Sequence, residues 1–239
     1  RKTKKMHKNN FMQSQTASAL ESALPLTEQA LLNLRRDVTM VVFEPGQKLK
    51  LDELQGRYGY SSSPLREALS KLSQEGLVRA DERKGFRVAD ISRSDLQDIT
   101  RMRLMLDVQA LESAMRHGSD EWEAGIVAAH YKLEKLERAL SDGPVVLDDA
   151  WVTTHKAFHL ALLGACDSPR LLHWCATLFD QAERYRQFSA RHRKTSRRKA
   201  VEHKRLMDAV IRRDIPTARR LLEEHITSTY HNVLTALKI

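Results

Sequence analysis

The feature that most constrains this chain is a short segment near its amino-terminal end. Ser63-Pro64 predicts the start of a helix, because a hydroxyl cap followed by proline in the first turn is typical of helix starts. Gly76 predicts its end. One face is apolar, and the opposite face carries Ser63, Arg66, Glu67, Ser70, Lys71 and Gln74. A short helix with such a polar, basic face is suited to the major groove of DNA.

The elements on either side of this helix follow a defined order. A helix over 27–42 and a shorter one over 51–58 precede it, separated by a Pro-Gly turn. Two alternating runs, 77–80 and 86–89, follow it and predict a β-hairpin, because a basic tip containing Gly85 joins them. This is the order of a winged helix-turn-helix. Each piece alone is also compatible with an ordinary solvent-facing helix or hairpin, so the prediction depends on the order.

The charge distribution is consistent with an acidic partner. The formal net charge is +9, and residues 1–89 hold 16 Lys and Arg against 10 Asp and Glu, whereas residues 90–239 hold 24 against 21. Nucleic acid is the first candidate. Simple solubility and an anionic membrane surface are alternatives that charge alone does not exclude. We expect a disordered basic arm over 1–23, the winged helix-turn-helix over 24–90 and a helical domain over 91–239.

Cysteine usage and hydropathy indicate a cytoplasmic protein without a membrane partner. Cys166 and Cys175 are too few for a disulfide framework and lack metal-finger spacing. No apolar run approaches the length of a membrane span. The basic start is not followed by an apolar segment, so a signal peptide is not expected.

From Ser92 onward the strand pattern disappears and helical periodicity takes over. Ser94 with Gln97 forms a plausible capping box for the first of these helices. Six helices are expected, over 94–117, 120–140, 149–164, 169–188, 197–213 and 216–237. Short connections between them predict a mainly α protein whose second domain is an antiparallel six-helix bundle. Pockets in bundles lie between facing helices.

Four histidines of this bundle are candidate metal ligands. His155 and His159 are four residues apart and therefore share one helix face. With His203 and His225 on later helices, neutral imidazoles could converge on a divalent ion such as zinc or nickel. No glutamate follows the first histidine as general base, so a metalloprotease is not indicated. A chance pair at this spacing is the alternative.

The front segment resembles a known family. The stretch that carries the resemblance is EPGQKLKLDELQGRYGYSSSPLREALSKLSQEGLVRADERKGFRV, which is similar to the winged helix of the GntR family. The resemblance implies that the first turn of the polar helix reaches base edges and that the wing tip enters a minor groove. Ser62 stands where many members have arginine. Without that cationic contact, the lysines become more important for DNA binding. The candidate DNA-binding residues are Ser61, Ser62, Ser63, Arg66, Lys71, Lys48, Lys50, Arg83, Lys84 and Gly85.

The back segment resembles the FCD ligand-binding domain of the FadR branch of this family. The stretches concerned are ITRMRLMLDVQALESAM, HKAFHLALLGACDSPRLL and EHKRLMDAVIRRDIPTARRLLEEHI. In many such domains an Asp and three His hold a metal, and the matching positions are His155, His159, His203 and His225. His155 replaces the usual Asp and removes a negative charge. Two interpretations therefore stay open, a bound divalent metal and a metal-free histidine cluster that contacts the effector directly.

The same resemblance suggests how an effector is held. Arg103 and Asp107 match the Arg and Glu of the family's R..LE helix. Either Arg103 grips an effector carboxylate, or Asp107 is simply its ion-pair partner. Arg184, Tyr185 and Arg186 are candidates for a second carboxylate, the alternative being an exposed basic helix end. Sequence segments of both domains are also similar to regulators of glutarate and related dicarboxylate catabolism. A hydroxy acid or a sugar acid would instead suit a site made of a metal and one arginine.

These patterns together predict a transcriptional regulator rather than an enzyme. The expected protein is a homodimeric repressor, released from a palindromic double-stranded operator by a small carboxylic acid such as glutarate. Activation by the effector is an open alternative. A metal-dependent hydrolase using the four histidines is a second hypothesis, although no carboxylate is obviously placed as base. A third is a non-specific nucleic-acid binder, which lacks a stacking platform because only 6% of residues are aromatic.

Overall fold

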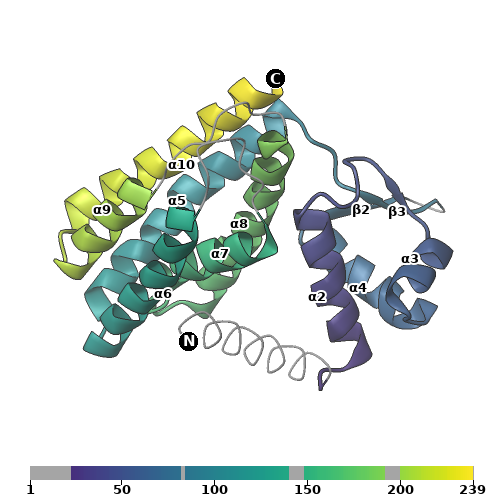
Figure 1. The fold of residues 1–239 in the computed structure, drawn as a ribbon, viewed down its shortest axis with the longest axis horizontal. Coiled ribbons are helices and arrows are strands. Elements are labelled where there is room, and N and C mark those ends of the chain that lie inside the picture. The colour runs from purple at the N-terminus through teal and green to yellow at the C-terminus, as the bar shows by residue number, and fades with distance from the viewer. Residues whose placement is uncertain (1–22, 82–83, 140–147, 192–199, 239) are drawn as a thin grey trace, which may run out of the picture. The chain divides into compact units, whose positions relative to one another are not determined.

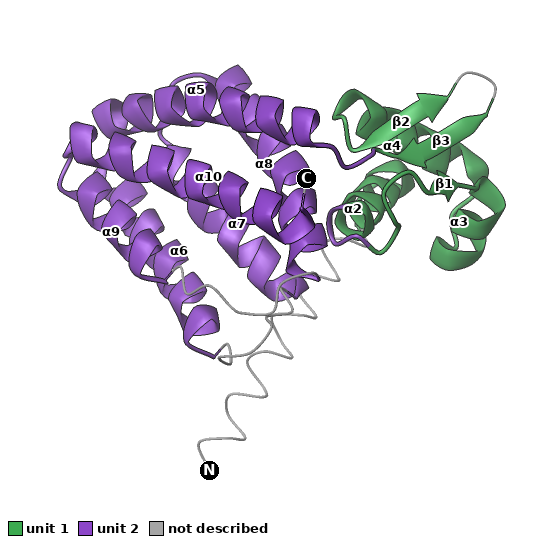
Figure 2. Ribbon diagram, turned by 90° about the horizontal axis from the view of Figure 1, so that it is seen from above, with its two compact units in different colours: residues 1–38, 42–89 green, residues 39–41, 90–239 purple. Residues whose placement is uncertain are grey.

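The computed structural model describes residues 23–81, 84–139, 148–191 and 200–238, so the predicted basic arm lies almost wholly outside the described residues. The chain divides into two compact units (Figure 2). Unit 1 comprises residues 1–38 and 42–89, and unit 2 comprises residues 39–41 and 90–239. Each unit has its own apolar core.

The described residues of unit 1 form three helices and a small antiparallel sheet (Figure 1). The helices are α2 (Leu26–Thr39), α3 (Leu51–Tyr58) and α4 (Ser62–Gln74). The strands are β1 (Lys48–Leu49), β2 (Val78–Asp81) and β3 (Gly85–Val88), in the spatial order β1-β3-β2. The apolar face of α4, with Leu65, Leu69 and Leu72 fully buried, packs into the core of this unit. The predicted winged helix-turn-helix is therefore confirmed.

The end of the first helix and the presence of β1 differ from the prediction. The first helix ends at Thr39 rather than near residue 42, because Val41 adopts a left-handed conformation (φ 55°) and the N–H of Val42 donates to the carbonyl of Asp37. That pair of features is a helix-ending motif that periodicity does not reveal. The strand β1 was not predicted, because two residues are too few to show an alternating pattern.

The start of α4 also differs. Ser63 was expected to cap it, but Ser61 is the N-cap and the helix begins at Ser62, which places Pro64 third in the first turn. Proline is tolerated there because the first N–H groups of a helix have no partner within the helix. Helix α4 thus starts two residues earlier than expected and includes both Ser62 and Ser63.

In unit 2 the residues that the structure describes form a bundle of six helices, as predicted (Figure 1). They are α5 (Arg93–His117), α6 (Asp120–Ala139), α7 (Asp149–Leu163), α8 (Pro169–Ala190), α9 (Ala200–Ile211) and α10 (Ile215–Leu237). α5 packs against α8 and α10, and α6 packs against α7 and α9. The first cap is Ser92, which accepts a hydrogen bond from the N–H of Asp95, rather than the predicted Ser94.

The helices of unit 2 bring their apolar faces together in one main core. Fully buried members come from five helices, among them Leu111, Ile126, Phe158, Ala209 and Ala218. Side-chain caps by Asp148, Ser168 and Asp214 set the starts of α7, α8 and α10. No helix within the described ranges is long and apolar enough to cross a membrane.

Candidate functional site

The outer side of α4 carries the residues predicted to contact DNA. Ser62, Ser63, Arg66 and Lys71 are all exposed. Within the described part of the chain, Arg66 and Lys71 form no hydrogen bond or ion pair. A guanidinium without an internal partner can donate two parallel hydrogen bonds to the O6 and N7 atoms of guanine.

The first turn of α4 is open to an anion. Ser61 adopts an extended conformation, and its side chain makes no capping hydrogen bond. The first turn holds no acidic residue. Glu67, one turn on, accepts hydrogen bonds from the hydroxyls of Ser63 at 3.3 Å and Thr27 at 3.2 Å. Uncapped N–H groups and the helix dipole attract anions, so this start is suited to a DNA phosphate.

Three cations line up across the small sheet. Lys48 on β1 is paired with Arg87 on β3, which is in turn paired with Arg79 on β2. Directly opposed residues share one face of a sheet. Asp81 contacts Arg87 at 2.9 Å and Arg79 at 3.5 Å, and it offsets part of this charge. Sequence reasoning named Lys48 and missed both arginines, because the register of β2 and β3 places Arg79 opposite Arg87, and the unpredicted β1 places Lys48 beside them.

The wing tip is described only in part. Lys84 and Gly85 are exposed, and Gly85 has a positive φ of 89°, a conformation that glycine adopts without strain. Arg83 lies outside the described residues. Lys50, at the start of α3, forms an exposed ion pair with Glu53 at 2.7 Å. Such a pair is worth little, so Lys50 can turn to a phosphate instead.

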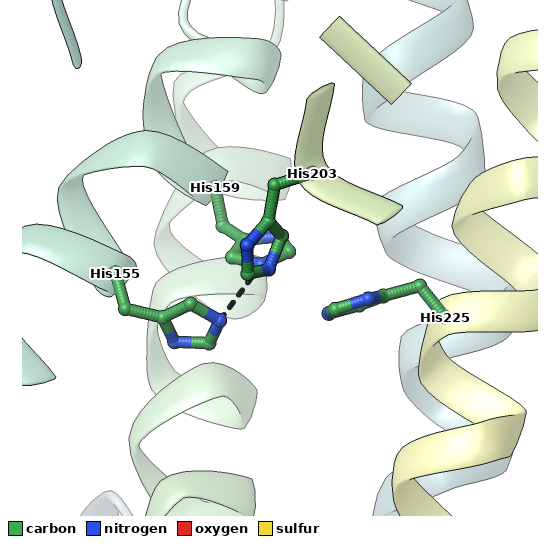
Figure 3. Close-up of side chains that lie close together, drawn as sticks. All are labelled: His155, His159, His203 and His225. Carbon is green, nitrogen blue, oxygen red and sulfur yellow. Dashed lines mark hydrogen bonds between the residues drawn. The ribbon is translucent and has the colours of Figure 1, made fainter. Parts of the chain in front are cut away.

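In unit 2 the four predicted histidines come together (Figure 3). His155 and His159 project from α7, His203 from α9 and His225 from α10. All four are buried, and one nitrogen of each lies within 4.8 Å of the others. The Nε2 atoms of His155 and His159 are 3.1 Å apart. Three separate helices thus supply one cluster, which a chance pair along α7 would not produce.

Carboxylates orient two of these rings from outside the cluster. Nδ1 of His203 lies 3.0 Å from Oε1 of Glu137, and Nδ1 of His225 lies 3.1 Å from Oε2 of Glu202. A carboxylate only accepts, so each Nδ1 carries a proton, and Nε2 is the nitrogen through which each ring would bind a metal. Nε2 of His203 is buried and has no hydrogen-bond partner among the residues described. Such a carboxylate–histidine arrangement is typical of metal ligands.

His155 is in the form that a metal requires. Burial, together with the positive charge of Arg186, holds the pKa of His155 well below its ordinary value. The ring is therefore neutral near pH 7, and its Nδ1 lies 4.0 Å from Oε2 of Glu183. Four buried imidazoles around one point fit a divalent ion such as zinc or nickel. A purely structural histidine cluster would leave the buried Nε2 of His203 unexplained.

A narrow pocket adjoins the cluster. It has about 10 Å³ of space for the centre of a water molecule, which is room for roughly one water, and Arg103, Asp107, His159 and Phe179 are among its lining residues. The guanidinium of Arg103 contacts one oxygen of Asp107 through Nε at 2.9 Å and through Nη2 at 2.8 Å. Both residues are buried. Arg103 therefore pairs with Asp107, as one sequence interpretation anticipated, and it also lines the pocket.

Arg184 and Tyr185 lie elsewhere in the bundle. Arg184 donates to the carbonyl of Asp90, and the hydroxyl of Tyr185 contacts the Asp95 carboxylate at 2.6 Å. Both side chains are fully buried, so the exposed basic helix end considered as an alternative is wrong. These contacts fix the start of α5, and neither residue lines the pocket beside Arg103.

Comparison with known proteins identifies both units. Residues 26–88 match the family described as bacterial regulatory proteins, gntR family, and residues 98–228 match the FCD domain. The chain belongs to the GntR family. Its FCD domain is the six-helix unit that carries the histidine cluster, and its GntR winged helix carries Arg66.

Relatives of this GntR regulator support the assignment. It is 37% identical to the HTH-type transcriptional repressor GlaR of Escherichia coli strain K12, over 81% of this chain and 89% of the relative. It is 33% identical to the uncharacterized HTH-type transcriptional regulator BphR of Paraburkholderia xenovorans strain LB400, over 85% and 83%. Its fold is similar to that of E. coli McbR/YncC, with a TM-score of 0.76, 20% identity and coverage of 89% and 98%. The family assignment makes the chain a transcription regulator, and the hydrolase hypothesis is not retained.

Proposed function

We propose that this GntR regulator is a repressor that binds a specific operator through α4 and the wing, and that a small carboxylic acid releases it. The observation that carries the proposal is Arg66, which is exposed on the outer face of α4, opposite a fully buried apolar face, and has no partner among the described residues. The printed name of GlaR as a repressor supports the direction of regulation.

The DNA contacts divide into two kinds in this proposal. Arg66 and the first-turn serines read base edges, because they occupy the exposed start of the recognition helix. Lys71, Lys84 and the row of Lys48, Arg87 and Arg79 contact phosphates, which position the protein without reading sequence. Ser62 in place of an arginine makes the sheet cations more important for affinity.

A divalent metal is part of the proposed effector site. His155, His159, His203 and His225 would hold it, with Glu137 and Glu202 fixing the tautomers of two rings. When bound, the ion supplies positive charge that attracts a carboxylate. Arg103 supplies directional hydrogen bonds to the same class of ligand, because Asp107 occupies only its Nε and Nη2 groups.

Binding to genomic DNA tests this proposal. Fluorescence anisotropy of the purified protein is measured on fragments enriched from its own genome, with random DNA as the control and C4–C6 dicarboxylates added in turn. We expect one fragment to bind at least about a thousandfold more tightly than random DNA, and one acid to release it. Equal affinity for every fragment, with a steep dependence on salt, would identify a non-specific DNA-coating protein instead.

A further inference from the structure

The outer nitrogen of His155 lacks the partner that two other rings of the cluster have. Nδ1 of His203 lies 3.0 Å from Oε1 of Glu137. Nδ1 of His225 lies 3.1 Å from Oε2 of Glu202. Nδ1 of His155, by contrast, is buried and has no hydrogen-bond partner among the residues that the structure describes. A buried polar atom without a partner costs free energy, so this nitrogen requires an explanation.

A carboxylate lies just beyond hydrogen-bond distance of that nitrogen. Oε2 of Glu183, on α8, is 4.0 Å from Nδ1 of His155, and both side chains are 1% exposed. This distance is too long for a hydrogen bond. Oε1 of Glu183 accepts a hydrogen bond from Gln187 at 2.9 Å, and Oε2 pairs with Arg186. The carboxylate is therefore held in place, and a small shift of the His155 ring is enough to complete the contact.

The packing of His155 allows such a shift within the plane of its ring. The ring stacks on Trp151, with the two centroids 4.4 Å apart and the two planes inclined by 16°. Stacked aromatic rings are stable in offset positions, so one ring can slide over the other and keep the contact. Trp151 therefore fixes the plane of the His155 ring and leaves its position within that plane adjustable.

Ligation of a metal decides which nitrogen of His155 carries the proton. Nε2 of His155 and Nε2 of His159 lie 3.1 Å apart (Figure 3), so one of them carries a proton and donates it to the other. Ligation of one ion by both rings through these nitrogens uses both Nε2 lone pairs. A neutral His155 then carries its proton on Nδ1, where Glu183 is the facing carboxylate.

We propose that Glu183 is a positioning residue of the metal site, which accepts the Nδ1 proton of His155 when that ring ligates a divalent ion. This inference rests on the metal in the proposed function, and it adds a third carboxylate to Glu137 and Glu202. The positive charge of Arg186 also acts on the His155 ring and disfavours a cation there. The two members of the Glu183–Arg186 ion pair thus have opposite effects on metal affinity.

Substituting each member of this ion pair separates positioning from structural support. The zinc affinity of the full chain is measured by competition with a chromophoric chelator. Glu183→Gln should weaken zinc binding by about 10–100-fold, because it removes the charged acceptor of His155 and leaves Arg186 uncompensated. Arg186→Gln should bind zinc at least as tightly as the wild type, because it removes the opposing charge. An ion pair with only a structural role would instead lower zinc affinity in both variants alike.

Two further variants provide a matched control and a safeguard against misfolding. Asp180→Asn removes the same charge from the same helix, but this carboxylate pairs with Lys156, so the variant should keep the wild-type zinc affinity. If circular dichroism shows that Glu183→Gln does not fold, the double variant Glu183→Leu/Arg186→Leu replaces it. This variant leaves no unpaired buried charge. It lacks the acceptor for His155 and should bind zinc at least about tenfold more weakly than the wild type.

The outcomes distinguish this inference from the proposed function. Equal losses of zinc affinity in Glu183→Gln and in either Arg186→Gln or Asp180→Asn overturn the role of Glu183, while the metal site stands. Wild-type affinity in folded Glu183→Gln, or in the folded double variant, overturns it as well. If the wild type binds neither zinc nor nickel, this inference fails together with the proposed metal, whereas operator binding and its release by an acid are tested separately.

Discussion

At the scale of single residues, substitutions of Arg66 and Lys84 distinguish sequence-specific base contacts from non-specific attraction to DNA. Arg66→Ala should lower discrimination between operator and random DNA by about 1–3 kcal/mol, because a bidentate contact to a base is lost. Lys84→Ala should weaken binding to both DNAs similarly and reduce the salt slope by about one. Anisotropy titrations at several salt concentrations measure both effects. A full operator preference in Arg66→Ala would contradict the role of α4.

His203 gives a residue-scale test of the metal site. Its buried Nε2 faces the cluster, and its Nδ1 is fixed by Glu137. Zinc or nickel should raise the Tm of the wild type after dialysis against a chelator, because an ion that binds only the folded state stabilises it. His203→Ala should abolish this rise, and Glu137→Gln should weaken metal affinity by about 10–100-fold.

The exposed His173 provides the control for that experiment. It lies on α8 outside the cluster, so His173→Ala should keep the full metal-induced rise in Tm. If the wild type shows no rise with any divalent ion, the metal-free histidine cluster is the correct interpretation of these four residues.

At the scale of helices and strands, Arg213 joins the ends of three helices. Its guanidinium donates to the carbonyls of Met115 and Gly118 at 2.6 and 2.8 Å and to Glu123 at 2.9 Å. It also lies 4.9 Å from the ring centroid of Trp122. It therefore satisfies carbonyl groups at the end of α5, a common need at helix C-termini.

Arg213→Ala should lower the free energy of unfolding by about 2 kcal/mol, because several charge-assisted hydrogen bonds are lost together. Arg213→Lys should recover only part of this, since an ammonium cannot reproduce the planar fork. Urea denaturation measures the change. The neighbouring exposed Arg212→Ala is the control and should alter stability by less than about 0.5 kcal/mol. Equal effects of the two substitutions would exclude this role for Arg213.

Elements with strong local signals could be predicted from the sequence, and short or strained ones could not. Periodicity and flanking turns located the helices of both units, and the spacing of His155 and His159 indicated a shared face. By contrast, β1 has only two residues, and α2 ends at a left-handed Val41. Such features depend on tertiary contacts rather than on local pattern.

The candidate pocket was only partly predictable for a similar reason. Arg103 and Asp107 are four residues apart on one helix, so their pairing follows from helical spacing. Phe179 and Arg186 are two turns apart on α8, so their proximity also follows from helical spacing. The burial of Arg186, by contrast, depends on how α8 packs in the bundle. The sequence named Arg184 and Arg186 together, and only the structure separates Arg184, which donates to Asp90, from Arg186, which lies over Phe179.

At the scale of the whole molecule, a palindromic operator requires two copies of the chain. We expect sedimentation analysis to give a dimer, and an operator of two half-sites about one helical turn apart. Mutating one half-site should weaken binding by at least about a hundredfold, because the second winged helix then loses its specific contact. A monomer with full affinity for a single half-site would contradict this arrangement.

Transcription in vitro tests the central claim most directly. A template carries the selected operator over its promoter, and transcript yield is measured with purified RNA polymerase, with and without this protein. We predict that the protein lowers transcript yield and that a dicarboxylate restores it, whereas the Arg103→Ala variant represses but no longer responds to the acid. A protein that raises transcription, or repression that no acid relieves, would contradict the account of an acid-released repressor.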